Sequence, residues 1–183
     1  KAYIDSTPNR LEEEKMAVVI QEIVGRRHGE LVYPNFAGNA RSRDFYPVAG
    51  AKADDGVACT ALGLGNTVVD GGRCVRFSPR HPKRLVQFAS VESTLDSAQR
   101  EFSALDLARS GDTEASPDAG WNLVTAGLDV AKQHGTLGPV GSVYSPENEA
   151  IYDGIHRPGI PLVTLSGVLK AELFPLGEVL DFL

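Results

Sequence analysis

The residues best suited to chemistry in this chain lie in a glycine-rich stretch, VACTALGLGNTVVDG. Gly63 and Gly65 follow a short apolar segment, 56–60, which is typical of a buried strand. The two glycines allow a tight turn, and Asn66 can open a short helix that stops at Gly71. A strand, a glycine turn and a helix start together present backbone N–H groups to an anion, so the pattern predicts an anion-binding turn.

Two arginines upstream form a second candidate for anion contact. Alternation in FAGNARSRDF puts Arg41 and Arg43 on the same face of an extended segment. Two parallel guanidinium groups can grip phosphate oxygens. The alternative is that they form surface ion pairs with nearby carboxylates, of which the sequence offers Asp44, Asp54 and Asp55.

Several catalytic and metal-binding motifs are missing from the sequence. There is no GxSxG of a serine hydrolase and no GxxxxGK[ST] phosphate loop. The stretch GLGNTVVDGG has Val68 where a dinucleotide fingerprint has its third glycine. Cys59 and Cys74 occur without CxxC or HExxH spacing, which argues against structural zinc, and so few cysteines predict a reducing, cytoplasmic compartment. We expect His28, His81, His134 and His156 to lie in loops.

Composition excludes some classes of partner. The 183 residues include 18 basic and 24 acidic side chains, a net charge of −6, so neither general nucleic-acid binding nor a membrane partner is expected. The basic segment 73–84, RCVRFSPRHPKR, is best interpreted as a solvated strand and turn, with an anion contact as the alternative. Because the chain begins at Lys1 without a signal segment, we expect it to be a piece of a longer protein.

The elements that must position these residues are mostly strands. The segment 16–24, MAVVIQEIV, is β-branched and apolar, and predicts a buried strand after a short helix over 6–16. Extended segments at 31–36 and 37–50 then predict an antiparallel meander. Residues 72–89 return to extended structure, and a helix is expected to start at Ser90 and run through SAQREF. Further on we predict a flexible loop at 110–120, strands at 121–131, 139–144 and 159–165, and an unassigned element at 174–183.

Two of these segments are more specific together than either is alone: MAVVIQEIVG (16–25) and VACTALGLGNTVVDG (57–71). Together they resemble the nucleotide-binding region of the phosphoenolpyruvate synthase and pyruvate phosphate dikinase family. That family has a strand of the form V-A-V-x-V-Q-x-M-V, followed by S-G-V-A-F-T and by G-L-G-E-x-V-V-x-G. The match covers about residues 15–75, and FAGNARS stands where the family has S-G-V-A-F-T.

The resemblance implies an α+β fold of the ATP-grasp type. Residues 1–75 would be the C-terminal ATP-grasp subdomain, with a mainly antiparallel sheet and few helices, and 76–183 a β-rich extension particular to a subfamily. Gln21, Glu22 and Ile23 would lie on the hinge strand that meets adenine and ribose. The alternative is that Gln21 and Glu22 are the solvent-facing breaks of a half-buried strand.

The resemblance also implies the phosphate and metal ends of the site. Gly63, Gly65, Arg41 and Arg43 would contact ATP, and Asn66 with Asp54 would approach Mg²⁺. The family has Glu where this chain has Asn66, and an N-cap role is the alternative for that residue.

The implied activity belongs to an intact parent protein. Its reaction would transfer a phosphoryl group from ATP to a histidine and on to pyruvate, giving phosphoenolpyruvate, through domains absent from this chain. No residue here receives a catalytic role, and we expect the chain alone to be inactive because half a site cannot neutralise the phosphates. The alternative function is a non-catalytic nucleotide-sensing or interdomain interaction module.

Overall fold

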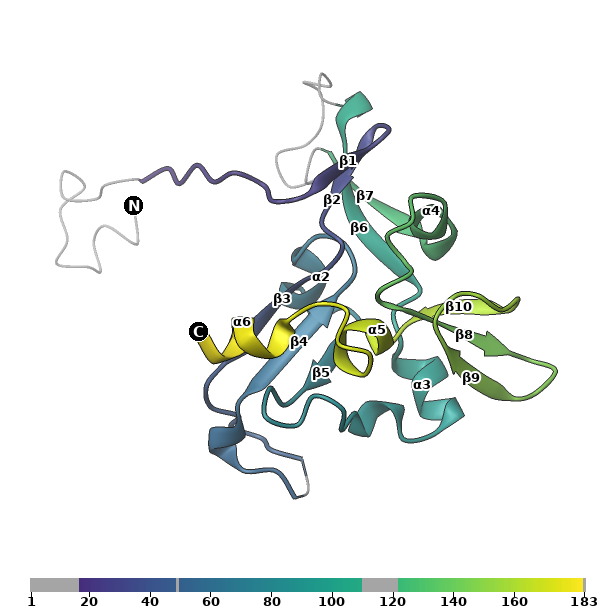
Figure 1. Cartoon of the computed structure of the whole chain (residues 1–183). Coiled ribbons are helices and arrows are strands. Elements are labelled where there is room, and N and C mark those ends of the chain that lie inside the picture. Colours follow the sequence, from purple (N-terminus) through teal and green to yellow (C-terminus); the bar gives the residue numbers. More distant parts are fainter. Residues whose placement is uncertain (1–16, 49, 110–121, 183) are drawn as a thin grey trace, which may run out of the picture.

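The computed structural model describes residues 17–48, 50–109 and 122–182 (Figure 1). Its strands form three antiparallel sheets, ordered β1–β2–β6–β7, β3–β4–β5 and β10–β8–β9. This confirms the predicted α+β class with mainly antiparallel sheets and few helices. The strands are β1 (Arg26–His28), β2 (Leu31–Tyr33), β3 (Ala37–Arg41), β4 (Val57–Ala61), β5 (Val75–Phe77), β6 (Glu101–Asp106), β7 (Leu123–Gly127), β8 (Gly141–Ser145), β9 (Ala150–Asp153) and β10 (Ile160–Val163).

The helices are short and lie between or after these strands. The α-helices are α2 (Asn66–Val69), α3 (Val91–Ser97), α4 (Leu128–Gln133), α5 (Ser166–Leu169) and α6 (Leu176–Phe182), and the 3₁₀ turns are η2 (Ala53–Asp55), η3 (Val86–Phe88) and η4 (Leu107–Arg109). Ser90 caps α3, because its side chain accepts a hydrogen bond from the Ser93 N–H. In Figure 1, α5 and α6 lie beside the β3–β4–β5 sheet, and their apolar side chains pack into the core.

One hydrophobic core connects the three sheets. Tyr33, Leu62, Phe102, Val140 and Leu165 are all fully buried, and they come from segments spread along most of the described chain. Additional bridges tie the sheets together, from Gly63 to Ser103 and from Gln99 to Val163. The division at residue 75 stays a prediction, and the structure adds that β6 pairs with β2 from the first segment.

The predicted buried strand at 16–24 is wrong for the described part of that segment. Residues 17–24 belong to no helix or strand, pair with no described strand, and are all exposed. Ile20 is 92% exposed and Val24 is 80% exposed. The β-branched composition indicated an extended, buried segment, but burial needs a neighbour, and no described element covers this one.

Three other elements differ from prediction. The helix from Ser90 ends at Ser97 instead of running through SAQREF, because the backbone is extended at Ala98 and Gln99 forms a bridge with Val163. The Gln99 side chain also bonds the Leu62 N–H (2.8 Å) and its carbonyl (2.9 Å). The strand predicted at 121–131 is β7 followed by α4, whose side chains Leu128 and Ala131 share a buried helical face. The hairpin strand β9 was missed. The segment 174–183, which the sequence left unassigned, contains α6.

Two predicted elements are present at the expected positions. The strand at 56–60 and the helix start at Asn66 are confirmed by β4 and α2. The helix expected over 6–16 and the loop at 110–120 lie outside the described residues. Within those residues, no helix has the length and apolar character needed to cross a bilayer.

Candidate functional site

The β3–β4–β5 sheet has one face on the core and one open face. The strand register places Asn39 and Arg76 on either side of Cys59, so these side chains share the open face, together with Arg41. Asn39, Arg41 and Arg76 are exposed, and Cys59 is half-buried. The alternate residues face the core and are buried: Ala58, Thr60, Val75 and Phe77.

Arg41 and Arg43 differ in their surroundings. Arg41 is the last residue of β3 and is exposed, and no carboxylate lies within ion-pair distance of it among the described residues. Arg43 lies beyond the strand and pairs with Asp54, at 3.4 Å between Nη1 and Oδ1. The surface-pairing alternative therefore holds for Arg43. Arg41 borders a cavity of about 870 Å³, whose charged lining also includes Asp54, Asp55 and Arg80.

A buried carboxylate holds the loop after β3 against the open face. Asp44 accepts hydrogen bonds from the Tyr46 N–H (3.0 Å) and from Arg76 Nη2 (2.7 and 2.8 Å to its two oxygens). The Tyr46 hydrogen bond, and after it Arg76, holds the pKa of Asp44 below its usual value against the opposing effect of burial. Much of the positive charge of Arg76 is thus neutralised within the chain.

The glycine turn has a clear packing role. Gly63 has a φ of +86°, and a Cβ there would lie 2.5 Å from the Ser103 carbonyl oxygen. Only glycine permits this approach, which lets the Leu64 N–H donate to the same oxygen at 2.9 Å. Gly65 is different, because its φ of −66° suits any residue and a Cβ would meet only the Ala37 Cβ at 3.7 Å. Gly63 therefore serves to join the turn to β6.

Asn66 faces a cavity of about 660 Å³. Its Nδ2 donates to Ser103 Oγ at 3.2 Å, while its Oδ1 is buried and accepts no hydrogen bond from the described residues. A buried acceptor without a partner is costly, so this oxygen is suited to a donor or cation supplied by a ligand. The cavity also has a charged rim, formed by Asp70, Arg73, Arg100 and Glu101.

The predicted metal ligands are not brought together. Asn66 follows the end of β4 and Asp54 precedes its start, and the strand alone spans four residue steps, or roughly 13 Å. Magnesium ligands lie about 2.1 Å from the ion, so these two residues cannot share one. Nor do the described residues contain a group of three His, Cys, Asp or Glu side chains placed to hold a metal ion. The donor set therefore does not fit a magnesium site built by this chain alone.

The predicted adenine hinge lies on the exposed segment described above. Gln21, Glu22 and Ile23 are all exposed, and the backbone there forms no hydrogen bond with other described residues. Its N–H and C=O groups are thus available to a ligand or to another strand.

The basic segment 73–84 behaves largely as a solvated surface. Arg76 pairs with Asp44, Arg80 lies 3.6 Å from Asp55, and Lys83 lies 3.0 Å from Glu172. These pairs leave less charge for an anion than the sequence alone indicates.

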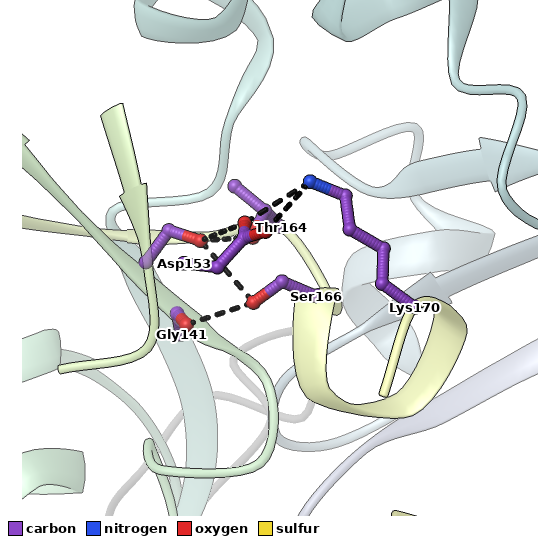
Figure 2. Close-up of polar contacts among 6 residues, drawn as sticks. Gly141, Asp153, Thr164, Ser166 and Lys170 are labelled. Carbon is purple, nitrogen blue, oxygen red and sulfur yellow. Dashed lines mark hydrogen bonds and ion pairs between the residues drawn. The ribbon is translucent and has the colours of Figure 1, made fainter. Parts of the chain in front are cut away.

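Sequence reasoning missed a buried hydroxyl cluster (Figure 2). Ser142 is completely buried, and its Oγ lies 2.5 Å from Thr164 Oγ1 and 3.3 Å from Ser166 Oγ. The same Oγ lies 3.4 Å from Asp153, whose carboxylate binds Lys170 at 2.9 Å. The cluster joins β8, β9, α5 and Thr164, which directly follows β10.

This cluster has a structural explanation. Ser166 also donates to the Gly141 carbonyl at 3.2 Å, so each hydroxyl has a partner, and Asp153 is already bound to a lysine. Thr164 and Ser166 of this cluster flank Leu165, a buried residue with a φ of +55°, and their hydrogen bonds fix the sharp turn from β10 into α5. Nothing in VGSVYS or TLSG signals that these hydroxyls meet.

A second missed cluster joins the first hairpin to α4. The rings of His28 and His134 stack with centroids 5.0 Å apart, and the Tyr33 hydroxyl lies 2.8 Å from His134 Nδ1 and 3.1 Å from Thr136 Oγ1. Burial, followed by the charges of His134 and Arg26, lowers the pKa of His28. The expectation that all four histidines lie in loops is wrong for His28, which belongs to β1.

Comparison with known proteins gives no relative for this chain: no family model, no curated protein and no solved structure matches it.

Proposed function

We propose that this chain contributes part of an ATP-binding site of the ATP-grasp type, within a phosphoenolpyruvate synthase-like phosphotransferase. In such a protein the nucleotide passes its phosphoryl group to a histidine, and then to pyruvate, on other domains. The proposal rests on the paired sequence segments 16–25 and 57–71, and on the geometry of the open face of β3–β4–β5.

The observation that carries the proposal is the contrast among the arginines around this face. Arg43, Arg76 and Arg80 each have a carboxylate partner. Arg41 projects from the end of β3 without one among the described residues. An exposed guanidinium without an internal counter-charge retains its donors for a phosphate, which it can bind through two parallel hydrogen bonds.

The exposed segment 17–24 supports the adenine end. Adenine recognition needs a backbone donor and an acceptor along an extended chain, and the groups around Gln21, Glu22 and Ile23 are unpaired with other described residues. Gly63 would act indirectly, by holding the turn against β6. We derive no step through Mg²⁺, because Asn66 and Asp54 lie at opposite ends of β4.

The test uses the natural protein in its full length, since the proposed site needs a second lobe. Incubation with Mg²⁺ and ATP, with and without pyruvate, is followed by ³¹P NMR. We expect AMP and phosphoenolpyruvate. ATP that binds without being consumed would favour the nucleotide-sensing alternative, and the absence of both binding and turnover would overturn the proposal.

A matched pair of variants isolates the phosphate contact. Arg41→Gln removes a charged hydrogen bond worth about 1.5–3 kcal/mol, so we expect ATP affinity to fall roughly 10- to 100-fold. Arg43→Gln removes an arginine that is also exposed but is already paired with Asp54, and should change the affinity much less. Equal effects of the two substitutions would contradict the role given to Arg41.

A further inference from the structure

The open face of β3–β4–β5 also carries the only two cysteines of the chain, Cys59 and Cys74. We propose that they form a peroxide-reactive thiol pair, in which Cys59 is the attacking thiol and Cys74 resolves the oxidised product to an intramolecular disulfide. This proposal is independent of ATP binding.

The register of β4 and β5 brings the two residues together. Cys59 lies directly opposite Arg76, and Cys74 is two residues before Arg76, so the side chains of all three share one face. Cys74 precedes β5 by one residue, and the hydrogen bond between the two thiols brings the Cys74 side chain within reach of Cys59. Both are half-buried, so a small oxidant has access to them while larger molecules have less.

The backbone around Cys74 is held in place. The side-chain amide of Gln87 donates to the Cys74 carbonyl (3.1 Å) and accepts from the Arg76 N–H (2.9 Å), as a neighbouring strand would. This clamp keeps the outer edge of β5 in register, and with it the approach of Cys74 to Cys59.

Electrostatics give the two thiols different roles. A hydrogen bond from Cys74 lowers the pKa of Cys59 to about 7; burial opposes this shift, Arg76 and Arg41 add to it, and Asp44 offsets part of it. The same hydrogen bond, with burial, raises the pKa of Cys74. Cys59 is thus the more readily ionised of the two thiols.

The reaction balances with a hydroperoxide as the oxidant. The Cys59 thiolate attacks the terminal peroxide oxygen, the O–O bond breaks, and the alkoxide or hydroxide leaves and takes a proton. Cys59 becomes a sulfenic acid. The Cys74 sulfur then attacks the Cys59 sulfur, the S–O bond breaks, and hydroxide leaves as water with the Cys74 proton. Two thiols lose two electrons to one peroxide, and one S–S bond forms.

The experiment treats the 183-residue chain with one equivalent of hydrogen peroxide at pH 7, followed by peptide mapping. We expect loss of two hydrogen atoms and a crosslinked peptide pair containing Cys59 and Cys74. In Cys74→Ser, Cys59 should stop at the sulfenic acid, which dimedone traps. In Cys59→Ser the attacking thiol is gone, so peroxide should produce no crosslink within the chain. Circular dichroism checks that both variants fold.

The expected rate follows from the chemistry of the thiolate. At pH 7 a thiol with a pKa of about 7 is half ionised, compared with about 3% for an ordinary thiol, a gain of roughly 16-fold. The lower basicity reduces the intrinsic nucleophilicity by about fivefold. Iodoacetamide should therefore modify Cys59 about threefold faster than a free cysteine, and Cys74 more slowly.

Two results would overturn the proposal. One is that iodoacetamide modifies Cys59 and Cys74 of the unmodified chain at the same rate, which would remove the distinction between the roles. The other is that the unmodified chain oxidises without a crosslink between Cys59 and Cys74, including a disulfide formed only between chains.

Discussion

Substitution of the two turn glycines separates packing from nucleotide contact. Gly63→Ala places a Cβ 2.5 Å from the Ser103 carbonyl oxygen at a residue whose φ is +86°. The left-handed conformation costs about 1–2 kcal/mol for a residue with a side chain, and the forced shift of β6 costs about 1–3 kcal/mol more. We expect a total loss of stability of about 3 kcal/mol.

Gly65→Ala is the matched control within the same motif. Its φ of −66° is ordinary for alanine, and the nearest atom to the new Cβ is the Ala37 Cβ at 3.7 Å. The stability should stay within about 0.5 kcal/mol or rise slightly, because alanine has less freedom than glycine in the unfolded chain.

Thermal unfolding followed by circular dichroism measures the difference. For a domain of this size a loss of 3 kcal/mol lowers Tm by about 6–12 °C. We expect that shift for Gly63→Ala and almost none for Gly65→Ala. If both variants melt together with the unmodified chain, the close approach of the turn to β6 is wrong.

Three further predictions concern side chains that the structure places in specific contacts. Tyr33→Phe removes the hydroxyl bonded to His134 and should lower the free energy of unfolding, measured in urea, by about 1–2 kcal/mol. Asp44→Asn weakens the contact with the partly exposed Arg76 and should lower the free energy of unfolding by about 1 kcal/mol. Because the pKa of Asp44 is lowered in the folded state, its contribution to stability is present above pH 4 and is lost as the pH falls further. The free energy of unfolding of the variant should therefore fall less steeply with decreasing pH in that range. The pKa of His28 is lowered as well, so the native state binds fewer protons than the unfolded one, and stability should decline as the pH falls through about 6.5. His28→Gln should flatten that decline in urea titrations across pH 5–7.5.

Local signals in the sequence predicted part of the fold. The apolar run before Gly63 and the turn residues after it locate β4 and α2, and Ser90 marks the start of α3. These succeeded because strand burial, turn geometry and capping depend on neighbours a few residues away. The exposed segment 17–24 failed because burial depends on a partner element, which the residues of the strand itself do not specify.

The candidate site was less predictable for the same reason. The hydroxyl contact between Ser142 and Thr164 joins residues 22 positions apart, and the Asp44–Arg76 pair spans 32. The sequence offered three carboxylates as partners for Arg41 and Arg43, and only the structure shows that Asp54 contacts Arg43 while Arg41 is left exposed. Register decides which side chains share a face, and it was also what brought Cys59 and Cys74 together.

Arg41 contributes to both proposed activities of the open face, ATP binding and thiol oxidation. Its positive charge would bind a phosphate, and the same charge, after that of Arg76, helps to lower the pKa of Cys59. A phosphate bound to Arg41 would cancel that contribution and favour the protonated thiol. Cys59 should therefore react more slowly with iodoacetamide when ATP is bound, in the full-length protein, and Arg41→Gln should abolish this protection. If ATP binds but the rate for Cys59 is unchanged, the nucleotide lies away from this face, while the thiol pair itself is unaffected.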